Sequence, residues 1–247
     1  MIAKKVHNIW KIINKEVQMN FKKEKELKNF YKKNIFEHQN IFQSLVHILA
    51  IKLQTPTINY KNIKNIIFSL KKYHANFQKS IQKDLIQIFK KDPVVKNFYI
   101  PFLYFKGFHA LQAYRISHYL WKENRKSLAL FLQNQISIIF SVDIHPAAKI
   151  GNGIILDHAT GIVIGETAIV EDNVSIFHSV TLGGKKYILG DRHPKIRQGV
   201  IIGAGAKIIG NIEIGFMSKI GAGSVVLTGI PPFSIAVGVP AKIIRKK

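Results

Sequence analysis

The chain has 247 residues, 47% of them hydrophobic, with 37 lysines and arginines against 14 aspartates and glutamates, and no cysteine. This length supports one large domain or two smaller ones, and the lack of cysteine excludes disulfides, thiolate metal ligands and a cysteine nucleophile. No apolar run approaches the roughly 20 residues that cross a bilayer, and no signal-peptide pattern opens the chain, so we predict a cytoplasmic protein without a membrane anchor.

The formal charge of +23 at pH 7 allows two interpretations. A basic protein can bind nucleic acid or a membrane surface. Alternatively, the charge reflects a compositional bias toward lysine, asparagine and isoleucine, which runs through the N-terminal half. The lysines are scattered and no nucleic-acid signature accompanies them, so we favour the bias and predict no nucleic-acid partner. A positive field would still attract a polyanionic small molecule.

Up to about residue 140, apolar residues recur at three- and four-residue spacing, which is typical of amphipathic helices. Prolines at positions 56, 93 and 101 punctuate these runs, and Asp92 precedes one of them just past an expected helix end. We therefore predict an α-helical domain over residues 1–140. The clearest sets are Ile41, Leu45, Ile48 and Leu49; Phe77, Ile81, Leu85 and Phe89; and Leu111, Tyr114, Arg115 and His118.

From residue 141 a six-residue period replaces the helical one. Aliphatic residues recur in a frame that shifts once after Leu156 and is interrupted after Leu182, and compact residues usually follow four positions later. The aliphatic positions are Ile144, Ile150, Leu156, Ile164, Val170, Ile176, Leu182, Ile202, Ile208, Ile214, Ile220 and Val226. The compact positions are Ala148, Ile154, Thr160, Ala168, Val174, Val180, Ala206, Ile212, Ser218 and Ser224.

This period has a direct physical meaning. Each unit is a short strand and a sharp turn, the aliphatic side chain points into a narrow core, and the compact residue packs near a corner. Three units close one triangular coil, and coils stack at the strand spacing of about 4.8 Å. The sequence therefore predicts an α+β protein whose residues 141–247 form a parallel β-helix, because a hexapeptide period is the signature of that fold.

Residues of about 183–199 interrupt the period for too long to be a turn. We predict that they leave the β-helix as a loop, and long loops on rigid scaffolds often carry function. This loop contains GDRHPKIR, which concentrates cationic and imidazole side chains.

Several segments between residues 90 and 243 resemble the bacterial serine acetyltransferases, a family of hexapeptide-repeat acyltransferases. They include FKGFHALQAYRISHYLW, FLQNQ, VDIHPAA, LDHATG, SVTLGG, GDRHPKI, KIGAGSVVL and GVPAKI. The repeat alone indicates only the superfamily, whereas VDIHPAA, LDHATG and GDRHPKI together indicate the enzyme. The first 90 residues resemble the family only in helical character. The resemblance implies a left-handed β-helix and transfer of acetyl from acetyl-CoA to the hydroxyl of L-serine, the first step of cysteine biosynthesis from serine.

Acetyl transfer needs a base, because the serine hydroxyl is a poor nucleophile at neutral pH. With no cysteine, direct transfer is simpler than an acyl-enzyme route. His158 occupies neither the aliphatic nor the compact position of its repeat, so by itself it would be a surface residue, and the LDHATG motif makes it the candidate base. The resemblance assigns Asp143 to orient His158 and stabilise its imidazolium, where a turn-forming residue is the simpler interpretation.

The substrate carries an ammonium and a carboxylate, so its pocket needs opposite charges held apart. The resemblance assigns Asp92 and Asp157 to the ammonium. It assigns Arg192 to the carboxylate, since a planar guanidinium suits a bidentate contact, and His193 to a further substrate contact. Without the resemblance, Asp92 would be interpreted as a helix-ending residue. Arg192 and His193 would be interpreted as solvated surface residues.

The resemblance places coenzyme A in the groove between neighbouring β-helices and implies no metal ion. It suggests backbone contacts at Gly184, Ala204 and Ala222, a weaker phosphate contact at Lys219, and an oxyanion contact from an amide near Gly184. Where the family has a glycine-rich stretch, this chain has KKYIL at residues 185–189. We expect a stiffer and more basic loop there, which leaves the coenzyme contact near Lys185 open.

A groove shared between β-helices predicts a homotrimer, and the resemblance adds contacts between N-terminal helices that give a dimer of trimers. It also implies that L-cysteine competes with L-serine. Family members commonly carry a C-terminal tail that enters O-acetylserine sulfhydrylase, and only four residues follow Ile243 here. We therefore expect no tight complex with that enzyme.

Three other functions stay open at this point. An acetyltransferase could act on another small acceptor such as a sugar, against which LDHATG and GDRHPKI argue. A repeat protein could have lost catalysis, against which the presence of Asp143, His158 and Arg192 argues. A nucleic-acid-binding module would owe its affinity to charge, and that affinity would collapse with salt.

Overall fold

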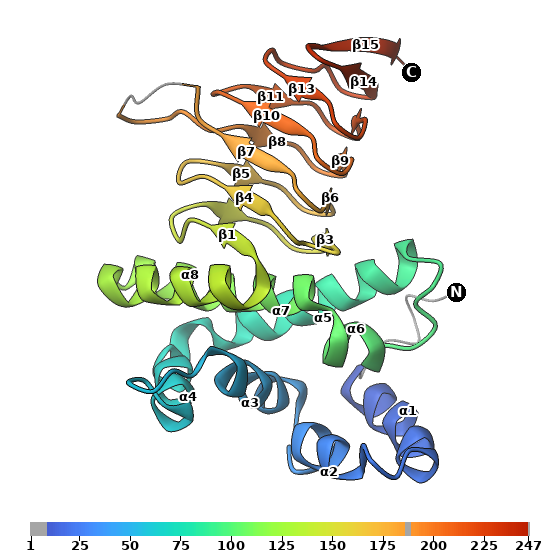
Figure 1. Cartoon of the computed structure of the whole chain (residues 1–247), viewed down its shortest axis with the longest axis vertical. Helices are drawn as coiled ribbons and strands as arrows, with labels where there is room; N and C mark the ends of the chain where they lie inside the picture. The colour runs from blue at the N-terminus through green and yellow to red at the C-terminus, as the bar shows by residue number, and fades with distance from the viewer. Residues whose placement is uncertain (1–8, 186–188, 247) are drawn as a thin grey trace. The chain divides into compact units, whose positions relative to one another are not determined.

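The computed structural model of the chain describes residues 9–185 and 189–246 (Figure 1). It divides into two compact units, residues 1–105 and 106–247, and each has its own hydrophobic core. Over the described ranges, none of the helices combines the length and the apolar character that crossing a membrane requires.

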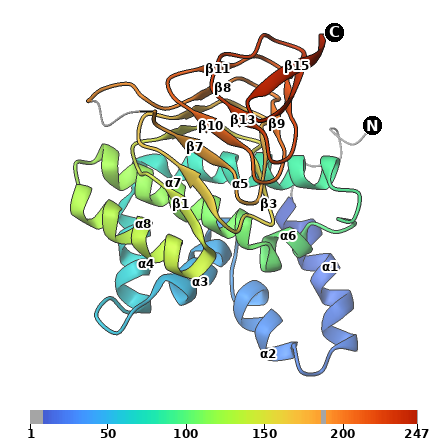
Figure 2. The same ribbon diagram turned by 45° about the horizontal axis from the view of Figure 1, so that its top comes forward.

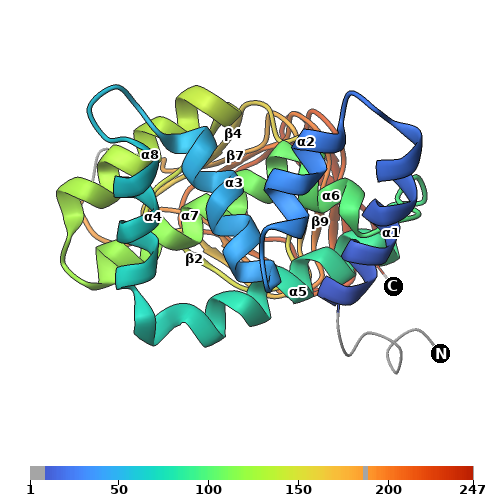
Figure 3. The same cartoon turned by 90° about the horizontal axis from the view of Figure 1, so that it is seen from below.

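The first unit is helical, as the apolar spacing predicts. Figure 3 shows α3 in the middle of this unit, with α4 on one side and α2 on the other. Most of α3 is buried, including Ile41, Leu45 and Ile48, and Asn40 begins this helix by accepting the backbone N–H of Gln43 (3.0 Å). The elements are α1 (Ile9–Lys23), α2 (Lys28–Tyr31), the short π-helix η1 (Lys32–Phe36), α3 (Ile41–Leu53), α4 (Tyr60–Ser69), the short 3₁₀ helix η2 (Lys71–Tyr73), α5 (His74–Lys91) and α6 (Tyr99–Tyr104).

The second unit opens with two helices, α7 (Lys106–Lys122) and α8 (Lys126–Phe140), which pack against each other and against the first coil of the β-helix. The guanidinium of Arg115 donates to the carbonyl of Gly151 (2.8 Å), and His118 Nδ1 bonds the carbonyl of Pro146 (2.7 Å). The change from helix to strand lies at Ser141, as expected, but the compact units divide before Lys106, because these bonds tie the two helices to the strands.

Short strands then wind into a parallel β-helix of about five coils with three sheets (Figures 1 and 2). All pairs are parallel except the last, β14 with β15, which is antiparallel. Sheet A contains β1 (Val142–Ile144), β4 (Ile162–Ile164), β7 (Thr181–Gly183), β10 (Lys207–Ile209) and β13 (Val225–Val226). Sheet B contains β2 (Lys149–Ile150), β5 (Ile169–Val170), β8 (Lys195–Ile196) and β11 (Glu213–Ile214). Sheet C contains β3 (Ile155–Asp157), β6 (Ser175–Phe177), β9 (Ile201–Ile202), β12 (Lys219–Ile220), β14 (Ser234–Gly238) and β15 (Ala241–Lys246).

The predicted aliphatic positions form the core of these coils. In sheet A, Ile144 is in register with Ile164, which pairs with Leu182, and the column continues through Ile208 to Val226. Each of these side chains is at most 2% exposed. Among all the predicted aliphatic positions, only Ile150 is half-buried, which confirms the hexapeptide frame.

Two deviations from the predicted frame shape the surface. Thr160 is exposed although a compact core residue was expected, and Ala159 is buried in its place, because Leu156 and Ile164 are eight positions apart, two more than in a regular repeat. The excursion is shorter than the predicted 183–199, because Lys195 and Ile196 pair with β5 and so belong to the third coil. The excursion proper therefore spans residues 184–194, of which 186–188 lie outside the described ranges.

Candidate active site

Turns from sheet C to sheet A stack into one corner of the triangular coil, which we call the C–A corner. Backbone bonds join its turns from coil to coil: Ser179 N–H to Thr160 O (2.8 Å), Gly205 N–H to His178 O (2.9 Å), and Gly223 N–H to Ala204 O (2.8 Å). His158 lies in the lowest of these turns, directly after β3.

The backbone of this lowest turn is unusual. His158 and Ala159 both have positive φ, 55° and 61°, a region that residues with a side chain rarely adopt. The buried Ala159 occupies the core side of the turn, so the His158 side chain points outward and is 76% exposed. Its nearest charged group is Asp157, with Oδ1 3.7 Å from Nε2, and the His178 ring centroid is 6.0 Å away. The imidazole is therefore held by few contacts.

The N-terminal end of helix α7 contacts this turn. Gly107 lies so close to the carbonyl of Leu156 that a Cβ there would come within 2.0 Å of the oxygen. The Lys106 ammonium donates to Thr160 Oγ1 (2.5 Å). The turn that carries His158 is thus fixed at its backbone, although its imidazole is mostly exposed.

Asp143 lies on β1, next to the same corner. The carbonyl of Ser141 accepts the N–H of Gly161 (2.7 Å), so the strand begins directly beside the turn that carries His158. Asp143 Oδ1 accepts a hydrogen bond from Gln133 Nε2 of α8 (2.7 Å). Within the described residues no hydrogen bond joins Asp143 to His158, so the predicted orienting contact is not formed in this single chain.

Turns from sheet A to sheet B form a second corner, the A–B corner, which contains Arg192 and His193. Thr167 organises it: its Oγ1 accepts the backbone N–H groups of Arg192 and His193 (both 3.0 Å), and its own N–H donates to His193 Nδ1 (3.2 Å). The Thr167 carbonyl accepts from Lys195 Nζ (2.8 Å). One threonine therefore binds the C-terminal end of the excursion at several points.

The side chains at this corner are also fixed. Arg192 pairs with Glu166 (2.6 Å), and this hydrogen bond holds the pKa of the Glu166 carboxyl below its ordinary value. His193 is 7% exposed, and burial lowers the pKa of its imidazole. Its ring lies against Gly165, where a Cβ would come within 2.0 Å of Cδ2 and Nε2. Because Nδ1 accepts a backbone N–H, the single proton of neutral His193 is on Nε2.

The A–B corner extends down to the first coil through His145. Burial lowers the pKa of this imidazole, against the opposing effects of Glu166 and Asp143. The Ala147 N–H donates to its Nδ1 (3.1 Å). Our sequence analysis did not single out His145, Glu166, Thr167 or Gln133 as individual site residues, although all four lie in segments that resemble the family.

The predicted site residues therefore lie at separate places within one chain. His158 and Asp157 lie at the C–A corner, whereas Arg192 and His193 lie at the A–B corner, across sheet A. Asp92 belongs to the first unit, where it ends α5 and accepts the N–H of Val94 (2.9 Å).

The candidate coenzyme contacts are divided in the same way. Ala204 and Ala222 follow each other up the C–A corner, above His158, and Lys219 is exposed on the adjoining sheet C. Gly184 lies at the A–B corner, where a Cβ added to this glycine would be 3.5 Å from Arg192 Cγ. Of the KKYIL segment, residues 186–188 lie outside the described ranges, and Lys185 and Leu189 are exposed.

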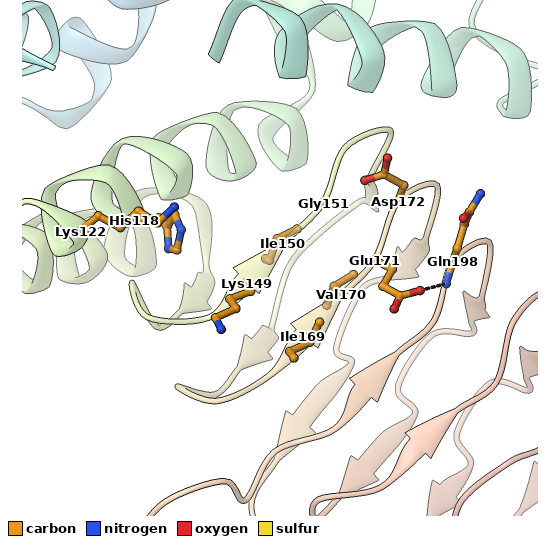
Figure 4. A pocket seen from close by; sticks show the side chains of 10 residues that line it. All are labelled: His118, Lys122, Lys149, Ile150, Gly151, Ile169, Val170, Glu171, Asp172 and Gln198. Atoms are coloured by element: carbon orange, nitrogen blue, oxygen red, sulfur yellow. Dashed lines mark hydrogen bonds between the residues drawn. The ribbon is translucent and has the colours of Figure 1, made fainter. Parts of the chain in front are cut away.

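An open groove of about 580 Å³ lies over sheet B (Figure 4). Ile150, Ile169 and Val170 line it, with Lys149 and Glu171 nearby. None of the predicted site residues lines this groove, so it is separate from both corners. The described part of the chain contains no cluster of three or more histidine, aspartate or glutamate residues that could hold a metal ion.

Known proteins are similar to this chain over its whole length. The family profile described as "Serine acetyltransferase, N-terminal" matches residues 9–113. A serine acetyltransferase of Buchnera aphidicola subsp. Schizaphis graminum (strain Sg) is 55% identical over 239 residues, which cover 96% of this chain and 92% of that relative. The first 90 residues thus share more with the family than the helical character that our sequence analysis recognised.

Solved structures agree with this match. A serine acetyltransferase in complex with cysteine has a TM-score of 0.94 at 50% identity and covers 96% of this chain and 98% of its own. A serine acetyltransferase from Brucella abortus strain S19 in complex with coenzyme A has a TM-score of 0.95 at 44% identity, covering 99% and 98%. These similarities confirm the predicted left-handed β-helix preceded by a helical region.

Proposed function

The chain belongs to the serine acetyltransferase family, and we propose that it uses His158 as the general base that activates L-serine. It is an acyltransferase with acetyl-CoA as co-substrate, and its product, O-acetyl-L-serine, belongs to cysteine biosynthesis. The observation that carries the proposal is the His158 turn, whose backbone is fixed in a left-handed conformation while the imidazole remains exposed. A general base must be within hydrogen-bond reach of the proton that it takes, and an exposed imidazole on a fixed turn can meet this requirement.

The proposed reaction transfers acetyl directly. Neutral His158 accepts the hydroxyl proton of serine while the serine oxygen attacks the thioester carbonyl. The tetrahedral intermediate then expels the coenzyme A sulfur, which leaves as the thiol by taking the proton from the His158 imidazolium and so restores the neutral base. No acyl-enzyme is needed, because the chain has no cysteine and the acceptor itself provides the nucleophile.

Asp143 is proposed to complete a dyad with His158. An ionised carboxylate beside the imidazole selects one tautomer and stabilises the imidazolium that forms during attack. The backbone bond between Ser141 and Gly161 supports this role, because it brings the start of β1 beside the His158 turn.

Recognition of serine is proposed to rest on charges at separate places. Arg192, whose guanidinium is already oriented by Glu166, would bind the carboxylate of serine, and His193 would add a contact through Nε2–H. Asp157 and Asp92 would bind the ammonium. Burial of His193 favours its neutral form, in which Nε2–H remains a donor.

We propose that the active enzyme is a homotrimer, or a dimer of trimers, because one chain separates the base from the carboxylate-binding group. If the C–A corner of each copy meets the A–B corner of the next, three copies close a ring with sheet A facing the axis. Val163, exposed to 39% on sheet A, is an apolar side chain that this arrangement would cover. Coenzyme A would then bind between Ala204 and Ala222 of one copy and Gly184 of its neighbour.

Subunit mixing tests this arrangement. His158→Ala chains, which have a low kcat, and Arg192→Met chains, which have a raised KM for serine, are unfolded together and refolded as mixed trimers. Rates are measured at a serine concentration far below the KM of the parent enzyme, where each variant alone is slow. If a site takes His158 from one copy and Arg192 from the next, about a quarter of the sites are intact at equal mixing, and that share of activity returns. A site contained in one chain would give no recovery.

The reaction is tested by thiol release from acetyl-CoA with and without L-serine. We expect release that depends on serine and yields O-acetylserine by mass spectrometry. Equal rates with sugar or amine acceptors would contradict the proposed acceptor. Release without any acceptor would indicate hydrolysis instead.

A further inference from the structure

Helix α8 contacts the proposed catalytic dyad through one side chain. Gln133 Nε2 donates to Asp143 Oδ1 at 2.7 Å, and Gln133 itself is half-buried. We propose that Gln133 is a positioning residue, which holds the Asp143 carboxylate in the orientation that serves His158. This inference rests on the proposed function, because it assigns to Gln133 a role exerted through Asp143.

The helix that carries Gln133 is held firmly in place. On either side of Gln133, the side chains of Leu132 and Ile136 are at most 2% exposed. The carbonyl of Ala129 accepts the hydroxyl of Ser117 on α7 (2.8 Å), and this hydroxyl is fully buried. Since α7 is in turn bonded to the first coil, the amide donor and the carboxylate acceptor belong to the same compact unit.

The connection between α8 and β1 is short. Ser141 ends the helix in a left-handed conformation, with φ of 56°, and its N–H bonds the carbonyl of Ser137 (3.0 Å). Strand β1 begins at the next residue, so only ten positions separate Gln133 from Asp143. The donor therefore cannot move far from the carboxylate unless the end of the helix unwinds.

The chemistry of an amide donor suits this position. A carboxylate has two oxygens, and a donor fixed on Oδ1 sets the plane of the group and leaves Oδ2 for a second partner. In the described residues Oδ2 of Asp143 forms no hydrogen bond. An amide is neutral, so it orients the carboxylate without cancelling the charge that would stabilise the His158 imidazolium, as a lysine or arginine would.

A double-mutant cycle tests the proposal. Gln133→Met preserves side-chain length but removes the donor, and we expect kcat to fall about tenfold, the effect of losing one hydrogen bond to a charged group in the transition state. The KM values for serine and acetyl-CoA should stay within about twofold, because Gln133 contacts neither. In the Asp143→Asn background the same substitution should lower kcat by less than about twofold.

Two further variants keep the test decisive. Gln135→Met makes the same chemical change two positions along α8, where no bond to Asp143 exists, and should behave like the parent enzyme. Gln133→Glu keeps the shape but places a second carboxylate against Asp143, so it should lose more activity than Gln133→Met. Thermal unfolding of every variant shows whether the fold is intact.

The outcomes separate the inference from the function on which it rests. If Asp143→Asn is slow and Gln133→Met has normal kcat, or if Gln133→Met costs the same in both backgrounds, Gln133 does not act through Asp143 and our inference is wrong. If Asp143→Asn itself has normal kcat, the proposed role of Asp143 fails, and the role of Gln133 fails with it.

Discussion

The two polar corners of the β-helix differ in how firmly they hold their side chains. At the C–A corner, the His158 side chain is 76% exposed and its nearest charged atom is 3.7 Å away. At the A–B corner, His193 is 7% exposed, Arg192 is paired with Glu166, and Thr167 binds the backbone of both. Both corners belong to the same β-helix, so the difference comes from the sequence and length of the turns and not from the strands.

This difference corresponds to two chemical tasks. A general base has to reach the proton that it accepts from the substrate, so its imidazole must have an accessible ring nitrogen. A group that recognises a fixed carboxylate benefits from being oriented in advance, because less freedom is then lost on binding. We infer that the exposed corner carries the chemistry and the bonded corner carries the recognition.

The largest expected effect comes from removing the base at the exposed corner. His158→Ala should lower kcat by about 10²–10⁴-fold, the usual contribution of general-base catalysis, with little change in serine KM. His178→Ala, the same change one coil higher at this corner, is the matched control and should cost less than about tenfold. Steady-state kinetics measure both, and near-normal turnover of the first variant would refute the assignment.

At the bonded corner the expected effect is on binding. Arg192→Met should raise the KM for serine by about 10–100-fold, the cost of a lost charge-assisted contact to the carboxylate, and should change kcat less. Arg197→Met is its control, because Arg197 pairs with Glu171 (2.7 Å) on the outside of sheet B, and with Glu213. That variant should leave KM within about twofold, as expected of exposed ion pairs. Equal KM changes in both variants would contradict a specific role for Arg192.

L-Cysteine separates the two corners further. It has the ammonium and carboxylate of serine and differs only at the atom on which the base acts, so we expect inhibition competitive with serine. Arg192→Met should weaken the binding of cysteine and the binding of serine by the same factor within about twofold. His158→Ala should still bind cysteine, as measured by calorimetry. Inhibition that added serine does not relieve would exclude a shared site.

The smallest expected effect is on stability. Burial lowers the pKa values of His118, His145 and His193 below the ordinary 6.5, so below about pH 6.5 the unfolded chain binds more protons than the folded one. Stability from these groups is complete above that pH and is lost as pH falls through their folded pKa values. The melting temperature should therefore drop by about 2–4 °C for each kcal/mol lost between pH 7.5 and 5.5. His193→Asn should make the decrease shallower, and an unchanged slope would count against burial as its cause.

Much of the fold was predictable because its signals are periodic. Three- and four-residue spacing located the helices, and the column from Ile144 to Val226 followed the six-residue frame. The frame shift between Leu156 and Ile164 was visible in the sequence, but its consequence was not. Only the structure shows that the longer turn buries Ala159 and exposes Thr160.

The candidate site was predictable through motifs, and its supporting contacts were not. LDHATG and GDRHPKI identified His158, Arg192 and His193 as candidates, because family motifs preserve residue types at fixed spacing. The bonds from Thr167 to Arg192 and from Gln133 to Asp143 cross 25 and 10 positions of the chain. No periodicity records such pairs.

The sequence by itself determined the repeat, the core columns and the family, because periodic burial and contiguous motifs are written along the chain. The tertiary structure decided which residues share a corner, which imidazole is buried and which is exposed, and that α7 and α8 belong with the strands. The physical reason is that coiling brings positions about 20 residues apart into register, so neighbours in space are set by turn lengths and close packing, as at Gly107 and Gly165.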